Sequence, residues 1–170
     1  MSDDVRKPAM DIEAFVRRYG GIYEHSDWVP RESFNEAIHA NDSGELAALF
    51  AQCVDNASHE RRLKLIRAHP DLAGRAAIAG ELTVESNSEQ ASAGIDQCTP
   101  EEFARFQDLN NRYTEKFGFP FVMAVRNSNR NAILSAFAAR LHNNAADEFE
   151  TAIAEIHKIA RMRLNAMGMQ

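Results

Sequence analysis

The sequence has few cysteines and no long apolar run, and each absence excludes a class of protein. Only two cysteines, Cys53 and Cys98, occur in 170 residues, and they lie far apart without a CxxC spacing. We therefore expect neither a zinc site nor a redox centre, and Cys53, inside an apolar run, is expected to be a small buried hydrophobe. No run of about 18 apolar residues occurs, so no membrane-spanning segment is expected.

Positive charge is also scarce. The formal net charge is −6, from 19 basic and 25 acidic residues, and the arginine doublets at residues 17–18 and 61–62 are isolated. Nucleic-acid binding needs clustered Lys and Arg, so the sequence argues against it. The N-terminus lacks the apolar stretch of a signal peptide and the C-terminus carries no peroxisomal or ER address, so a cytoplasmic protein is expected.

The residues that are present indicate one all-α domain covering residues 1–170. Apolar residues make up 45% and charged residues 26%, as in ordinary globular proteins. Periodic apolar positions and capping residues predict a compact bundle of roughly eight helices. The expected helices span residues 11–19, 30–40, 43–56, 58–69 and 86–94, a segment beginning at the capping box of Thr99, a segment from Ser128 or Asn129 to 141, and residues 147–167.

Two stretches are not expected to form long helices. Residues 69–85 contain two glycines and little periodicity, so a loop with a short helical turn is predicted. Residues 117–125 are the one candidate strand, but a lone strand cannot satisfy its own backbone groups. This segment is therefore predicted to be an extended connector.

Four places depart from the local rules of helix formation, and function is expected at such places. His69 ends a helix before Pro70, so its imidazole has a rigid backbone suited to acid or base work. The polar run at residues 86–90 opens a short helix whose later small residues would let a ligand approach the backbone. Both features also have ordinary explanations, namely a histidine stabilising a helix C-terminus and a well-capped first turn.

The other two departures lie later in the chain. Residues 118–126 are apolar but irregular, and could either present backbone groups to a polar ring or form an ordinary buried connector. In the last helix an apolar stripe steps by three and four residues from Phe149 to Ala160 and continues to Arg163, which predicts an inward-pointing arginine. This arginine would bind a carboxylate of the protein or of a ligand, or extend to solvent at the helix end. His157 and Arg161 lie off the stripe and are expected on the solvated face.

The other histidines carry weaker signals. The six histidines show no metal-ligand spacing, so no metal is expected. His25 lies in a loop near the single tryptophan, and it is a minor candidate for contacting the residues that bind the substrate.

In chain order, several stretches resemble the OHCU decarboxylase family, in full 2-oxo-4-hydroxy-4-carboxy-5-ureidoimidazoline decarboxylase. The resemblance covers most of the chain, and its motifs are specific because they occur together and in order. They are GGIYEHSDWV at residues 20–29, HPDLAG at 69–74, SNSEQ at 86–90, FGFPFV at 117–122 and RMRL at 161–164. Two departures fall at variable places: residues 87–88 are less acidic than in many relatives, and Met123 is a common variation.

The resemblance implies an all-α enzyme without a cofactor, often a homodimer, that removes CO₂ from OHCU to give (S)-allantoin. It implies that His69 is the catalytic histidine, that Glu89 is the second catalytic acid or base, and that Arg163 contacts the substrate. It also implies a set of substrate-binding positions. These are Pro70, Ser86, Asn87, Ser88, Glu89, Gln90, Phe121, Val122, Met123, Ala124 and Val125.

The chemistry of OHCU agrees with this set. An imine beside the carbon that carries the carboxylate can accept the electron pair when CO₂ leaves, so a pyridoxal or thiamine cofactor is not needed. His69 would manage the proton on the hydroxyl or on the ring, and Glu89 would orient His69 and hold the ureido N–H groups. Arg163 would hold the carboxylate or another polar group of the substrate.

Two alternatives stay open on the sequence. A non-catalytic helical binding module would keep the core but would not need His69, Glu89 and Arg163 together. A hydrolase of a related ureide could use His69 as its base. Circular dichroism of the product separates catalysis from binding, and trapping of released CO₂ separates decarboxylation from hydrolysis.

Overall fold

The computed structural model describes residues 10–74 and 80–168, and within these ranges the chain is helical with no β-strand. Eight α-helices and one short 3₁₀ helix follow one another along these ranges, which confirms the predicted all-α class. The elements are α1 (Ile12–Tyr19), α2 (Trp28–Ala37), α3 (Ser43–Asp55), α4 (His59–Arg67), α6 (Val84–Ser92), η1 (Ile95–Gln97), α7 (Pro100–Phe117), α8 (Arg130–Arg140) and α9 (Ala145–Ala166). No helix in the described residues is long and apolar enough to cross a membrane.

Local capping chemistry explains where most helices begin. The predicted capping box of Thr99 and Glu102 is present at the start of α7, and Asn129, one of the two candidates, caps α8. Three predicted starts, at residues 30, 86 and 147, are two residues late. For α6 the reason is that the hydroxyl of Thr83, not that of Ser86, accepts the capping hydrogen bond.

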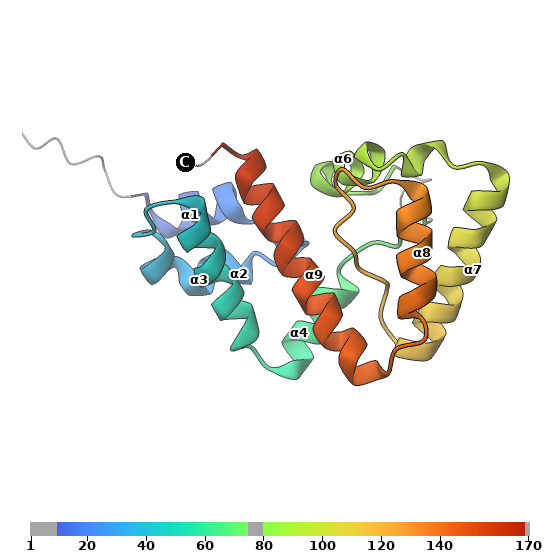
Figure 1. The fold of residues 1–170 in the computed structure, drawn as a ribbon. Helices are drawn as coiled ribbons and strands as arrows, with labels where there is room; N and C mark the ends of the chain where they lie inside the picture. The colour runs from blue at the N-terminus through green and yellow to red at the C-terminus, as the bar shows by residue number, and fades with distance from the viewer. Residues whose placement is uncertain (1–9, 75–79, 169–170) are drawn as a thin grey trace, which may run out of the picture.

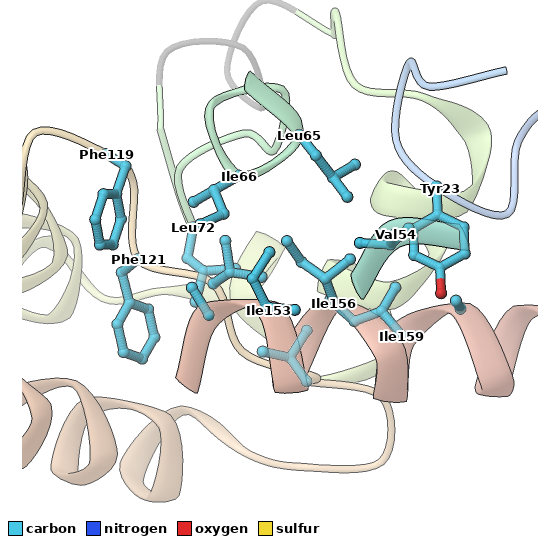
Figure 2. Packing of buried hydrophobic residues seen from close by; sticks show 14 of the residues in the cluster. Tyr23, Val54, Leu65, Ile66, Leu72, Phe119, Phe121, Ile153, Ile156 and Ile159 are labelled. Carbon is cyan, nitrogen blue, oxygen red and sulfur yellow. The ribbon is translucent and has the colours of Figure 1, made fainter. Parts of the chain in front are cut away.

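Helix α9 is the central element of the molecule. In Figure 1 it runs diagonally between α1–α3 on one side and α6–α8 on the other, and it contacts α3, α4 and α7. Its inward stripe carries Ile153, Ile156 and Ile159 into the core, where Figure 2 shows them beside Leu65, Leu72 and Tyr23. A single helix therefore carries its side chains toward both halves of the molecule.

The connector between α7 and α8 is extended, as predicted, and packs inside the protein. Helix α7 ends at Gly118, whose φ of 76° lies in the left-handed region that glycine adopts without strain. Phe121 then stacks on Phe137 with ring centroids 3.8 Å apart, and Arg140 donates from Nη1 to the carbonyl of Val122 at 2.6 Å. Stacking and hydrogen bonding together fix this stretch of backbone.

One predicted region lies partly outside the described residues. The loop with a helical turn, expected over residues 69–85, includes residues 75–79, which the structure does not describe. On its two sides, Leu72 and Ala73 form a turn, and α6 already begins at Val84.

Candidate active site

A cavity opens where four separate parts of the chain meet: the loop after α4, helix α6, the connector before α8 and helix α9. It brings together most of the residues predicted from the sequence, although they are up to 94 positions apart along the chain. The lining residues are His69, Pro70, Leu72, Ser86, Glu89, Gln90, Phe121, Val122, Met123, Val125, Ile159 and Arg163.

Three of the predicted substrate-binding residues do not line this cavity. Asn87 and Ser88 are exposed, whereas Ser86, Glu89 and Gln90 on the same helix are buried. Positions three and four apart share a helix face, so the residues directly after Ser86 must point elsewhere. Ala124 is half-buried and is also absent from the wall. The cavity wall therefore includes some residues of each run and not others.

His69 is held as a neutral, buried imidazole. Its exposed fraction is 8%, and its Nδ1 lies 3.0 Å from the carbonyl of Leu65, one turn back along α4. A carbonyl can only accept, so Nδ1 carries the hydrogen and Nε2 is left as the nitrogen that can take up a proton. Burial lowers the pKa of His69 to about 4, against the opposing negative charge of Glu24.

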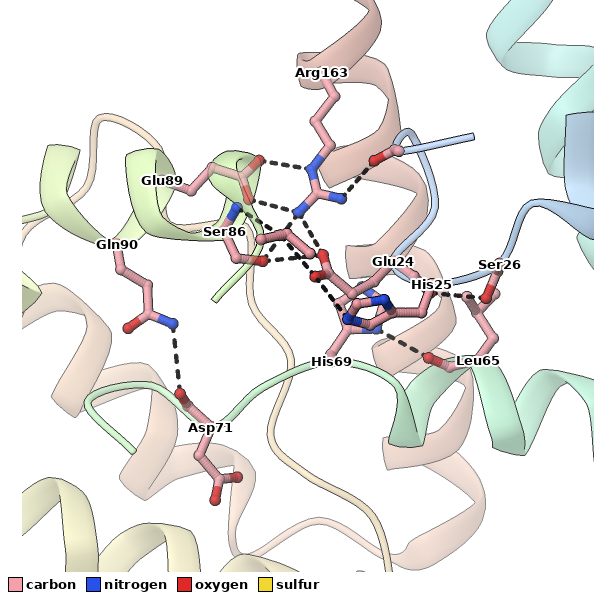
Figure 3. A network of polar contacts seen from close by, with 12 residues as sticks. Glu24, His25, Ser26, Leu65, His69, Asp71, Ser86, Glu89, Gln90 and Arg163 are labelled. Carbon is pink, nitrogen blue, oxygen red and sulfur yellow. Dashed lines mark hydrogen bonds and ion pairs between the residues drawn. The ribbon is translucent and has the colours of Figure 1, made fainter. Parts of the chain in front are cut away.

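This geometry corrects the expected partner of His69. Glu89 is expected from the sequence to orient the imidazole, but the contact that orients it is the backbone carbonyl of Leu65. Both Glu89 oxygens instead accept hydrogen bonds from Arg163 (Figure 3). The proposed histidine and the proposed acid are therefore held by different partners.

Arg163 points inward, as the apolar stripe predicts, and it is 4% exposed. Its Nε and Nη2 donate to the two oxygens of Glu89 at 2.9 and 2.8 Å, which is the bidentate geometry that suits a guanidinium. Nη1 donates to the carbonyl of Gly21 at 3.0 Å, and Nη2 also donates to Glu24 at 2.8 Å. Burial acts to lower the pKa of Arg163, but hydrogen bonding and the negative charges of Glu89 and Glu24 outweigh it and raise the pKa.

Glu24 is the residue of this network that is not predicted from the sequence. It is 2% exposed and accepts hydrogen bonds from the hydroxyls of Thr83 and Ser86 as well as from Arg163. Burial acts to raise the pKa of Glu24, but Arg163 and these hydrogen bonds outweigh it and lower the pKa. A signal existed in the sequence, because Glu24 lies in the GGIYEHSDWV motif next to a buried tyrosine, Tyr23.

Polar side chains hold the loop after His69 against the cavity. The Gln90 side chain accepts from the Ala73 backbone N–H. It also donates to the Asp71 carbonyl, as Figure 3 shows. Asn110 and Gln107 of α7 donate to the carbonyls of Leu72 and Ala73. Ala73 has a positive φ of 52°, a conformation that costs energy for a residue with a side chain. The loop is thus fixed from two helices in a strained backbone conformation.

Three further expectations are corrected or refined. His157 is not simply solvated, because its Nδ1 lies 2.8 Å from the Tyr23 hydroxyl and its Nε2 2.9 Å from Asp55. His25 is mostly exposed, although its Nε2 lies 3.8 Å from Glu24. Cys53 is half-buried, not buried. Within the described residues, no group of three His, Cys, Asp or Glu side chains is arranged to hold a metal ion.

Comparison with known proteins places this chain in a family. The family model described as OHCU decarboxylase matches residues 8–165. A 2-oxo-4-hydroxy-4-carboxy-5-ureidoimidazoline decarboxylase of Haloferax volcanii is 43% identical over 155 residues, which cover 91% of this chain and 89% of the relative. The protein of the same name from Mus musculus is 35% identical over 162 residues, covering 95% and 90%.

Solved structures show the same fold. A structure described as (S)-allantoin synthase superposes with a TM-score of 0.74 at 31% identity, covering 92% of this chain and 50% of the other. A structure described as OHCU decarboxylase in the presence of (S)-allantoin superposes with a TM-score of 0.68 over 84% of this chain and 91% of the other. The second pair is 21% identical, so that likeness supports the fold alone.

Proposed function

The chain belongs to the OHCU decarboxylase family, and from this membership we propose how its site carries out the family's reaction. The protein is a carboxy-lyase that decarboxylates OHCU to allantoin in the degradation of urate. The roles proposed for individual residues rest on one observation. His69, Glu89 and Arg163 come from three elements distant in sequence and line the same cavity.

The reaction needs little more than positioning and proton transfer. The bond between the ring carbon and the carboxylate breaks, and its electron pair forms a carbon–carbon double bond while the imine pair moves to the ring nitrogen. The nitrogen takes a proton, the neighbouring hydroxyl loses one, and the former imine carbon gains one. The balance is one proton taken up for each CO₂ released, and no cofactor is needed because the substrate provides the electron sink.

The described side chains suit these steps. His69, neutral in the free protein, takes and returns a proton through Nε2 at the hydroxyl or at the ring. Arg163 holds the carboxylate or another polar group of the substrate, and Glu89 fixes Arg163 and contacts the ureido N–H groups. Pro70, Ser86, Gln90 and the backbone of residues 121–125 complete the substrate-binding surface.

Several finer features belong to the same proposal. A ring fixed between residues 121–125 and His69 exposes one face to the proton donor, so the product is a single enantiomer, (S)-allantoin. Residues 1–170 act as a single domain, two copies of the chain form a homodimer, and the enzyme works in the cytoplasm. The match of the family model to residues 8–165 supports the single domain, and the resemblance to the family supports the homodimer.

The test is a single assay on freshly generated OHCU, followed by circular dichroism of the product. The protein should accelerate formation of (S)-allantoin, and His69→Asn should lose about 10²-fold or more in rate. His142→Asn, at an exposed histidine away from the cavity, is the matched control and should keep the full rate. Racemic allantoin at the spontaneous rate would favour a binding module, and turnover without CO₂ release would favour a hydrolase.

A further inference from the structure

Glu24 lies behind the cavity wall, where three elements meet. Its segment precedes α2, and its carboxylate reaches Thr83, the N-cap of α6, Ser86 in the first turn of α6, and Arg163 of α9. Oε1 accepts from Thr83 at 2.8 Å, and Oε2 accepts from Ser86 at 3.0 Å and from Arg163 at 2.8 Å. Glu24 does not itself line the cavity, so it acts on a substrate only through other residues.

The charges around Glu24 do not balance. Within the described residues, two buried carboxylates, Glu24 and Glu89, contact the single guanidinium of Arg163. His69 is neutral in the free protein, so the buried cluster has one negative charge in excess. The other titratable group facing Glu24 is His25, which is 67% exposed and 3.8 Å away, where solvent screens its effect.

This excess has a consequence when an anionic substrate enters. A substrate carboxylate would bring a second uncompensated negative charge into a buried site, which is costly. A proton taken up by the cluster offsets that charge, and His69 Nε2 is a position that can accept it. The same proton satisfies the balance of the reaction, in which one proton is taken up, in net, for each carboxylate that leaves as CO₂.

We propose that Glu24 is a further positioning residue for this reaction: it holds the Arg163 guanidinium and the Ser86 hydroxyl in place, and it favours a proton on His69 once a carboxylate substrate is bound. The proposal rests on the proposed function. It is independent of the assignment of Glu89, because Glu24 and Glu89 contact Arg163 from different elements. The negative charge of Glu24 acts on His69 in the direction that stabilises the imidazolium.

The test compares Glu24→Gln with Glu24→Asp and measures kcat and KM for OHCU across the pH range. The amide keeps the shape but removes the charge, so kcat should fall about 10-fold or more while the protein stays folded. The imidazolium loses a neighbouring negative charge, so the decline of kcat toward high pH should begin about one pH unit lower than in the wild type. Glu24→Asp keeps the charge but not the reach, so it should lower kcat with the wild-type pH profile.

The matched control is Glu148→Gln, which removes another buried carboxylate paired with an arginine outside the cavity. It should lower stability without moving the pH profile. A Glu24→Gln variant with the kcat and pH profile of the wild type overturns the proposal. If Glu24→Gln does not fold, Glu24→Asp decides, and an unchanged kcat in that variant also overturns it. Failure of the wild type to accelerate allantoin formation would overturn the proposed function instead.

Discussion

Two arginines, each paired with a buried carboxylate, divide the described part of the molecule into regions of different character. Arg163 contacts two carboxylates beside the cavity, whereas Arg140 contacts one carboxylate, Glu148, away from it. Glu148 is fully buried and also accepts hydrogen bonds from Tyr113 and Asn143. Burial acts to raise the pKa of Glu148, but the hydrogen bonds from Arg140, Tyr113 and Asn143 outweigh it and lower the pKa.

The difference lies in charge balance. The Arg140 cluster is one positive charge against one negative charge with several donors on the carboxylate, which is how a structural ion pair tolerates burial. The Arg163 cluster has an excess carboxylate and a neutral histidine, and this arrangement lowers stability. Such clusters are expected where a protein binds a ligand or a proton. The first cluster supports the cavity wall from behind by holding the Val122 carbonyl, whereas the second places Glu89 and Arg163 in the wall itself.

The largest effect should come from removing Arg163. Arg163→Ala leaves Glu24 and Glu89 buried without their cation, which typically costs about 3–5 kcal/mol of unfolding free energy, and activity should be lost. Arg163→Lys should also be impaired, since a lysine cannot donate bidentately to Glu89. Chemical denaturation and the OHCU assay measure both effects.

The matched control is Arg161→Ala, two residues earlier on the same helix and exposed. It should leave both the unfolding free energy and the activity close to those of the wild type. Small and equal effects at the two arginines would contradict the distinction between a reactive and a solvated face of α9.

How much of this could be read from the sequence depends on whether the interaction is local. The Thr99 capping box and the inward direction of Arg163 follow from spacing within one helix, and both are confirmed. The partner Glu24 could not be found this way, because it lies 139 residues from Arg163 and meets it only through the packing of α9. Asn87 and Ser88 lie outside the cavity wall, because the contiguous motif at residues 86–90 divides between two faces of α6.

Acid should destabilise the reactive cluster before the structural one. Burial lowers the pKa of His69 from 6.5 to about 4, so the unfolded chain binds a proton at a pH where the folded protein does not. Stability should therefore fall as pH decreases from about 6.5 to about 4, by on the order of 3 kcal/mol in total. The lowered pKa of Glu148 contributes stability that is present above the ordinary carboxylate pKa of 4.5 and is lost as the pH falls from there through the lower folded pKa.

Unfolding free energy measured across this pH range in wild type and His69→Asn checks the linkage. The asparagine cannot titrate, so the variant should lose less stability between about pH 6.5 and 4 than the wild type. If the unfolding free energies of the two proteins change with pH in the same way, the pKa of His69 is not lowered by folding.

An intermediate effect is expected from the structural cluster. Glu148→Gln removes the charge that Arg140, Tyr113 and Asn143 share, at a cost of about 1–3 kcal/mol in unfolding free energy. Thermal unfolding should show this loss, while the pH dependence of kcat stays that of the wild type. A pH profile that moves with Glu148→Gln would show that the two clusters are coupled and would remove the distinction drawn between them.

The smallest effect should come from the two motif residues that face away from the cavity. Asn87 and Ser88 are exposed on α6, whereas Gln90 on the same helix lines the wall and holds the Ala73 and Asp71 backbone. Asn87→Ala and Ser88→Ala should change stability by less than about 0.5 kcal/mol and leave KM for OHCU unchanged. Gln90→Ala is the matched comparison. It should raise KM because the loop after His69 loses the two hydrogen bonds that Gln90 makes to its backbone. A higher KM in Asn87→Ala or Ser88→Ala would mean that the substrate reaches beyond the cavity wall to the outer face of α6.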